Sequence, residues 1–299
     1  MHWSRWKGGV GGIGRIGRAT AAAILALAAL LVQTATPARA ASPETPANTS
    51  AAPRPSLQVE TIATRGGASQ SVLLVQPAAP KAVLLVVPRD HRTLHLSADG
   101  AVQGEAAASF LVRSRLLFAA RGLAVALPTA TEYPRNAALL DDELRIHGNP
   151  VADLTALAER LRQRLKVPVW LAAEHNSAAF AAGAVVTVGA SRDFDGLLLT
   201  GSVVGGKEGL GSVDASKIGI PTLLVQHKED ACSGAGYGEA ESLFDALAHA
   251  PRKDLIGVGG GRDRDGKRTN PCSPFARHGF SGIESLVVGG IADWLEKRP

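Results

Sequence analysis

Serine, histidine and acidic side chains stand directly after apolar runs that indicate buried strands. One run leads into Glu174, His175, Asn176 and Ser177, and another leads into a loop that contains Asp230. A serine becomes a nucleophile when a histidine removes its proton, and an acid that orients the imidazole lets it act as a base near neutral pH. These residue types therefore allow nucleophilic catalysis at the strand ends, provided that the fold brings them together.

Histidines at the same strand ends could instead bind zinc, together with neighbouring carboxylates. That set would comprise His91, His175, His227 and His278. His91 and His95 stand four residues apart, but they lie in a loop-like stretch without the H-E-x-x-H pattern. Two cysteines without a histidine pair at finger-like spacing give no metal motif either. We therefore expect neither a metal ion nor an organic cofactor.

Short runs rich in Val, Leu and Ile alternate with helical patterns, which is typical of a largely parallel sheet covered on both faces. The predicted strands are Leu57 to Ala63, Ser71 to Gln76, Ala82 to Pro88, Leu123 to Leu127, Val167 to Ala172, Gly196 to Thr200, Thr222 to Gln226 and Asp254 to Val258. The predicted helices are Glu105 to Ala120, Val151 to Leu165, Ser177 to Val185, Gly238 to Ala248 and Ile283 to Lys297. We expect the first two strands to pair antiparallel through Gly66 and Gly67. Ligand sites of such sheets gather at the carboxyl ends of the strands.

The first forty residues have the pattern of an export signal. Basic residues precede an apolar run from Ala21 to Val32, and Ala38-Arg39-Ala40 forms a small-residue cleavage site before Ala41. About twelve apolar residues are fewer than the roughly twenty that span a bilayer, so we expect no permanent membrane anchor. We predict a signal peptide over 1–40, a flexible lead-in over 41–56 and one domain over 57–299, in a protein that is periplasmic or secreted.

The charge balance argues against a nucleic-acid partner. Residues 1–40 hold five of the 32 Lys and Arg and none of the 27 Asp and Glu, so the mature chain has 27 residues of each sign. A formally neutral chain has no compositional support for a basic face that releases counterions from nucleic acid.

The chain has two cysteines, Cys232 and Cys272. An even count in an exported chain favours a disulfide, and a reduced buried pair is the alternative. The two cysteines are 40 residues apart. A bridge that closes a loop of this length would stabilise the fold by roughly 4 kcal/mol in the chain-entropy model.

Several separated blocks, in order, resemble a bacterial family of exported α/β-hydrolase-fold proteins whose substrates are generally uncharacterised. The blocks are Phe110 to Ala119 with Gly122, Val167 to Leu171, His227 to Cys232, Pro271-Cys272, and His278 to Glu284. The resemblance implies a mostly parallel eight-stranded sheet flanked by helices on both faces. It also implies that Asp230 is the acid and His278 the histidine of a triad, in the chain order Ser, Asp, His. A Cys232–Cys272 bridge would then hold the acid and histidine loops together.

The chain departs from this family at the strand-to-helix turn, where a G-x-S-x-G pattern lifts a serine above the sheet. The turn here is Ala173-Glu174-His175-Asn176-Ser177, so His175 occupies the expected nucleophile position. If the strand is two residues longer, Ser177 becomes the nucleophile. Alternatively, Ser177 only opens the following helix.

A second departure is the segment Pro88-Arg89-Asp90-His91-Arg92, which stands where the family has a glycine-rich loop. Backbone N–H groups approach a tetrahedral oxyanion closely only where side chains leave room, and glycine permits this best.

Together these patterns predict an exported α/β-hydrolase-like pseudoenzyme, weakly active or non-catalytic, that binds a small-molecule ligand, an ester-like substrate or a partner. The alternative hypothesis is an active esterase-type serine hydrolase that uses Ser177, His278 and Asp230.

Overall fold

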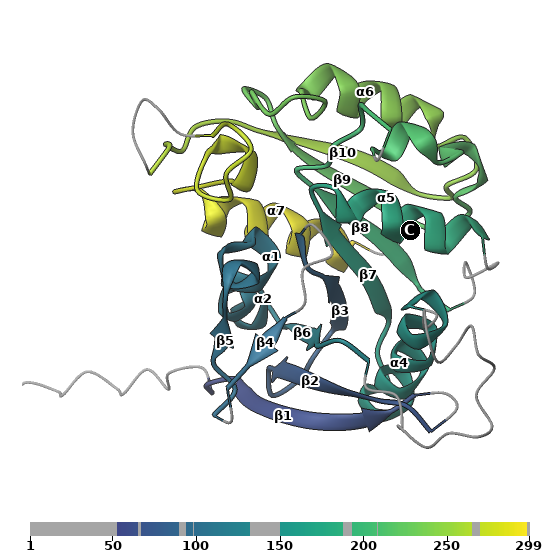
Figure 1. Cartoon of the computed structure of the whole chain (residues 1–299), viewed down its shortest axis with the longest axis vertical. Helices are drawn as coiled ribbons and strands as arrows, with labels where there is room; N and C mark the ends of the chain where they lie inside the picture. Colours follow the sequence, from purple (N-terminus) through teal and green to yellow (C-terminus); the bar gives the residue numbers. More distant parts are fainter. Residues whose placement is uncertain are drawn as a thin grey trace, which may run out of the picture. The chain divides into compact units, whose positions relative to one another are not determined.

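The apolar runs of the sequence form one eight-stranded sheet in the computed structural model, which describes residues 53–64, 67–89, 94–97, 99–131, 150–187, 193–207, 209–264 and 270–297. The strands are β1 (Ser56–Ala63), β2 (Ser69–Gln76), β3 (Ala82–Val87), β6 (Leu123–Pro128), β7 (Val169–Glu174), β8 (Gly196–Thr200), β9 (Thr222–His227) and β10 (Lys253–Val258). Their order across the sheet is β1-β2-β6-β3-β7-β8-β9-β10 (Figure 1). β2 runs antiparallel to both of its neighbours, and all the other strand pairs are parallel.

All eight predicted strands and the antiparallel first pair are therefore confirmed. Gly66, predicted in the turn between β1 and β2, lies outside the described residues. A small antiparallel pair that the sequence analysis missed, β4 (His95–Leu96) with β5 (Val102–Gln103), forms a separate two-stranded sheet.

Helices cover both faces of the sheet (Figure 1). One layer holds α4 (Pro150–Leu165), α5 (Ser177–Thr187) and α6 (Tyr237–Ala246), and the other holds α1 (Phe110–Arg113), α2 (Arg115–Ala120) and α7 (Glu284–Glu296). Successive strand side chains point to opposite faces, so Val83 and Leu85 of β3 join the first layer whereas Leu84 and Val86 join the second. Every residue of β3 is buried, which explains its unbroken apolar run.

The segment predicted as one helix from Glu105 to Ala120 is broken, and this prediction is wrong. Ser109 is extended (φ −54°, ψ 137°) and separates a 3-10 helix from α1. The carboxylate of Glu174, at the end of β7, accepts the backbone N–H of Phe110 at 3.1 Å and of Leu111 at 2.9 Å. The first N–H groups of a helix have no partner within the helix, so a distant strand end satisfies them and fixes where α1 begins.

The other four predicted helices differ from α4, α5, α6 and α7 by at most two residues at either end. Short 3-10 helices lie in the connections of the described chain, namely η2 (Glu105–Ala108), η4 (Leu210–Ser212), η5 (Ala215–Lys217) and η6 (Arg277–Gly279). β7 ends two residues later than predicted, directly before His175.

Within the described ranges, no helix has the length and apolar character that crossing a bilayer requires. The predicted signal peptide and most of the predicted lead-in lie outside the described residues, and Ser56 already belongs to β1.

Candidate functional site

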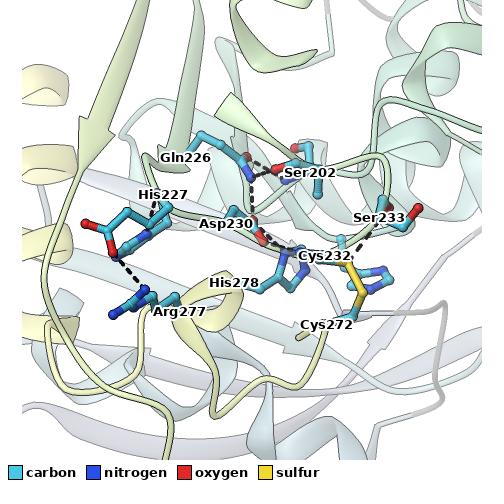
Figure 2. Close-up of polar contacts among 12 residues, drawn as sticks. Ser202, Gln226, His227, Asp230, Cys232, Ser233, Cys272, Arg277 and His278 are labelled. Carbon is cyan, nitrogen blue, oxygen red and sulfur yellow. Dashed lines mark hydrogen bonds and ion pairs between the residues drawn. A yellow bond between two sulfur atoms is a disulfide. The ribbon is translucent and has the colours of Figure 1, made fainter. Parts of the chain in front are cut away.

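The turn after β7 and the loop after β9 meet η6 at the carboxyl edge of the sheet. Asp230 stands three residues beyond β9, and His278 is the middle residue of η6. Oδ2 of Asp230 lies 2.8 Å from Nδ1 of His278 (Figure 2). Because an ionised carboxylate only accepts hydrogen bonds, Nδ1 donates the proton. The side chains are 0% and 2% exposed, respectively, so the structure brings together, in a buried contact, the two residues that the sequence analysis paired.

Gln226, the penultimate residue of β9, fixes the Asp230 carboxylate from the other side. Its Nε2 donates to Oδ2 of Asp230 at 2.7 Å and to the carbonyl oxygen of Ala235 at 2.5 Å, and its Oε1 accepts the Ser202 N–H at 3.1 Å (Figure 2). Oδ1 of Asp230 accepts the backbone N–H of Cys232 at 2.9 Å. Three donors therefore hold the carboxylate, and the carboxylate in turn fixes the plane of the His278 ring.

The Cys232–Cys272 disulfide is present, as predicted, with Cα atoms 4.6 Å apart. It joins the loop that carries Asp230 to the segment before η6 (Figure 2). The bridge therefore links the two halves of the Asp230–His278 pair covalently, in addition to their hydrogen bond.

His175 occupies the turn between β7 and α5 in the left-handed conformation, with φ of +55°. Left-handed backbone is uncommon outside glycine, although histidine is among the residue types enriched there. The His175 ring packs edge-to-face on the His278 ring, with centroids 4.8 Å apart and planes at 85°. The side chain that projects from the turn toward the Asp230–His278 pair is thus an imidazole.

The backbone N–H of Asn176 donates to Nδ1 of His175 at 2.8 Å. In hydrolases with this kind of turn, the N–H of the residue after the nucleophile is one of the oxyanion donors. Here that N–H is taken up by the imidazole, whose remaining proton in the neutral form then lies on Nε2.

Ser177 is the first residue of α5 and is fully buried. Its Oγ donates to the carbonyl oxygen of Pro88, beyond the end of β3, at 2.6 Å. A hydroxyl has one proton, so in this conformation the proton goes to Pro88 rather than to His278. The longer β7 considered in the sequence analysis does occur, yet the left-handed turn residue is His175, two positions before Ser177.

A small cavity lies beside the rings of His175 and His278. It has a volume of about 10 Å³ and is bordered by Phe110, His175, Gly201, His278 and Phe280 among others. That space holds about one water molecule. The segment Pro88 to Arg92 stands where the resembling family has a glycine-rich loop, and its residues 90–92 lie outside the described residues.

Gly201, just beyond β8, lets the backbone approach the His278 loop. Its φ is +50°, and a Cβ added there would lie 2.8 Å from the carbonyl oxygen of His278. A side chain at this position would therefore push η6 away from the sheet.

Arg113 of α1 supports the turn that carries His278. Its guanidinium donates to the carbonyl oxygens of Gly279 and Ala108 and pairs with Glu284 at 3.2 Å. Burial lowers the pKa of Arg113, and the carboxylates of Glu174 and Glu284 oppose that shift.

The histidine set that the sequence analysis weighed as an alternative zinc site comes together only in part. Both ring nitrogens of His227 bind backbone groups, the Gly260 carbonyl oxygen at 2.9 Å and the Glu229 N–H at 3.0 Å. His91 lies outside the described residues. A different set of candidate metal ligands does converge, because one nitrogen of His175 and both disulfide sulfurs lie within 4.8 Å of one another.

Sequence reasoning missed the roles of Gln226 and Glu174. Gln226 carried a usable signal, because a polar side chain in a run of buried residues needs a hydrogen-bond partner. The partners of Glu174 lie 63 and 64 residues away in sequence, and no local pattern points to them.

No protein-family model matches the sequence, and no curated protein matches it. Solved structures do. A dienelactone hydrolase from Anabaena variabilis is 12% identical, with a TM-score of 0.53 over 81% of this chain and 97% of that one. An esterase from Pyrococcus furiosus is 10% identical, with a TM-score of 0.52 over 81% and 90% of the two chains. At such low identity the likeness shows the fold, and with the strand order it establishes the α/β-hydrolase fold.

Proposed function

We propose that this α/β-hydrolase-fold protein is exported and binds a small molecule at the carboxyl edge of its sheet, with weak or no serine-hydrolase activity. The observation that carries the proposal is the identity of the turn residue. His175, with φ of +55°, stands against His278, whereas the hydroxyl of Ser177 donates to Pro88.

Two requirements of acyl transfer are compromised at this site. The turn offers an imidazole in place of a hydroxyl, and the Asn176 N–H is engaged by that imidazole. The adjoining cavity of about 10 Å³ limits a bound ligand and a reacting substrate alike. A nucleophile and preorganised oxyanion donors contribute most of the rate in such enzymes. Their joint loss supports a binding role better than an efficient hydrolase.

The retained Asp230–His278 pair defines the chemistry of a ligand. With Nδ1 of His278 held by the carboxylate, the neutral ring offers Nε2 as an acceptor, and its protonated form offers a donor. An ester-like or lactone-like small molecule suits such a group. The names of the two similar structures, an esterase and a dienelactone hydrolase, are in keeping with this class.

The same pair supports a second candidate, a serine hydrolase that uses Ser177. For that reaction the Ser177 hydroxyl would have to leave the Pro88 carbonyl oxygen, 2.6 Å away, and turn toward His278. That hydrogen bond stabilises the present rotamer by about 1 kcal/mol, so a bound substrate would have to supply at least this energy.

Export is supported by the sequence of residues 1–40 and by the Cys232–Cys272 disulfide, since disulfides persist mainly in oxidising compartments. Fractionation of cells that express the full chain tests this part. We expect a product that begins at Ala41 and lies outside the cytoplasm.

Labelling with a fluorophosphonate probe and hydrolysis of p-nitrophenyl acetate test the catalytic part. We expect the wild-type protein and Ser177→Ala to give equal, background signals in both assays. Labelling that disappears in Ser177→Ala, together with hydrolysis that disappears in His278→Ala, would establish the serine hydrolase instead.

Thermal denaturation with a panel of small esters, lactones and carboxylic acids tests the binding part, because a ligand that prefers the folded state raises Tm. We expect a concentration-dependent rise that is lost in His278→Ala. A rise of the same size in that variant would show that binding occurs elsewhere.

A further inference from the structure

We infer that His175, Cys232 and Cys272 form a site for a divalent transition metal of the zinc class when the disulfide is reduced. One ring nitrogen of His175 and the two Sγ atoms lie within 4.8 Å of one another. Histidine nitrogen and cysteine sulfur are the ligands that zinc prefers. The inference is independent of the proposed ligand-binding role.

The separations suit one ion after a small movement. Zinc–sulfur distances of about 2.3 Å and zinc–nitrogen distances of about 2.0 Å place tetrahedral ligands roughly 3.5–3.8 Å apart. Two sulfurs that no longer share a covalent bond move apart to a non-bonded distance in the same range. The nitrogen must approach by about 1 Å, which side-chain rotation can supply without moving the backbone.

Reduction is chemically balanced with a dithiol as the co-reactant. Cys272 is partly exposed, whereas Cys232 and His175 are buried, so a thiolate of the dithiol attacks Sγ of Cys272 and Cys232 leaves as a thiolate. The second thiol of the dithiol then attacks its own mixed disulfide and releases Cys272. The dithiol loses two electrons and becomes a disulfide. The metal takes the two thiolates, and any thiol protons go to solvent.

Charges of both signs lie near the proposed ligands. The carboxylate of Asp230 accepts the N–H of Cys232 at 2.9 Å, which places a negative charge beside them. Of the basic residues, Arg277 of η6 pairs with Glu229 at 2.7 Å, and Arg89 borders the same cavity as His175. The cavity that borders His175 has a volume of about 10 Å³, and a water molecule there would complete the coordination.

Metal binding at His175 would change the hydrogen bonding of the Asn176 N–H, the candidate oxyanion donor of the turn. Nδ1 of His175 now accepts the Asn176 N–H at 2.8 Å. The metal takes Nδ1 in place of that N–H, or it takes Nε2 after the ring proton moves to Nδ1. Both outcomes break the hydrogen bond and release the Asn176 N–H.

Cobalt titration of the reduced protein tests the inference. The exported protein is reduced with a dithiol, and the dithiol is then removed in the absence of oxygen. We expect one Co²⁺ per chain, with sulfur-to-cobalt charge-transfer absorption and the visible bands of tetrahedral cobalt. The oxidised protein should show neither the charge-transfer absorption nor the visible bands. His175→Ala should weaken binding by more than about 100-fold, since loss of a direct ligand exceeds the 10–100-fold effect of outer-shell partners. His249→Ala is the matched control and should bind normally, because His249 is exposed and bonds the Ser216 carbonyl oxygen.

Three results would overturn the inference: no cobalt bound to the reduced protein at one equivalent, equal affinity in His175→Ala, or equal binding by the oxidised protein. If reduction alone unfolds the chain, zinc added to the reduced protein should restore the near-ultraviolet circular dichroism. Failure of zinc to restore it would also reject the site.

Discussion

Replacing His175 with serine should convert the turn after β7 into a hydrolytic site. The change places a hydroxyl in the left-handed position, φ +55°, beside His278. It also removes the imidazole that accepts the Asn176 N–H at 2.8 Å and so frees that oxyanion donor. The smaller side chain enlarges the adjoining cavity of about 10 Å³.

The expected gain follows from the groups that are restored. One oxyanion donor is worth about 10²–10³ in rate, and a positioned general base about 10²–10⁴. These effects are not additive, and Pro88, which follows β3, has no N–H to act as a second donor. Because His175→Ala frees the same Asn176 N–H, only the hydroxyl and its general base distinguish the two variants. We therefore expect about 10²–10³-fold faster hydrolysis of p-nitrophenyl acetate than in His175→Ala, in the lower part of the general-base range, or about 2.7–4 kcal/mol of barrier at 1.36 kcal/mol per tenfold.

The assay compares initial hydrolysis rates and fluorophosphonate labelling in four variants with similar Tm values. They are His175→Ser, His175→Ala, and His175→Ser combined with either Ser177→Ala or His278→Ala. His175→Ala supplies the background without imidazole or hydroxyl. Adding Ser177→Ala to His175→Ser should leave the gain intact, whereas adding His278→Ala should abolish it. The reasoning is refuted if folded His175→Ser is no faster than His175→Ala, or if the gain depends on Ser177.

Three changes should lower the free energy of unfolding, measured with urea. Asp230→Ala should cost about 2–5 kcal/mol, because three buried donors lose their acceptor, whereas the exposed control Asp245→Ala should change it by less than about 0.5 kcal/mol. Replacing Cys232 and Cys272 with serine should cost roughly 4 kcal/mol, since the bridge closes a 40-residue separation. Gly201→Ala should cost about 1–3 kcal/mol, because its φ is +50° and the new Cβ would lie 2.8 Å from a carbonyl oxygen.

Each of these changes has an outcome that contradicts its basis. Equal stabilities for Asp230→Ala and Asp245→Ala would show that the buried donors find other acceptors. An unchanged unfolding midpoint without the cysteines would mean that the loop is ordered without the bridge. A neutral Gly201→Ala would show that η6 shifts freely.

The sheet was predictable because burial on both faces leaves a direct trace in the sequence. Strands such as Ala82–Val87 and Gly196–Thr200 are buried at every position, so their apolar runs are continuous and end sharply at polar residues. The disulfide was predictable from the cysteine count and the predicted export. The pairing of Asp230 with His278 followed from chain order on that sheet, once the resemblance had indicated the fold.

The sequence alone left the turn residue undecided between His175 and Ser177. The extent of β7 depends on its neighbours, since Ala173 pairs with Val87 of β3 and Glu174 with Thr200 of β8. Those backbone contacts carry the strand through Glu174 and place His175 at the bend. Ser177 then falls inside α5, where its hydroxyl meets Pro88.

Long-range contacts also decided the break before α1 and the approach of His175 to the cysteines. Glu174 caps a helix 63 residues earlier in the chain, and a nitrogen of His175 lies within 4.8 Å of sulfurs that belong to Cys232 and Cys272. Periodicity records only which face of an element is buried. Which side chains meet across the carboxyl edge depends on strand register and loop path, and these exist only in the folded chain.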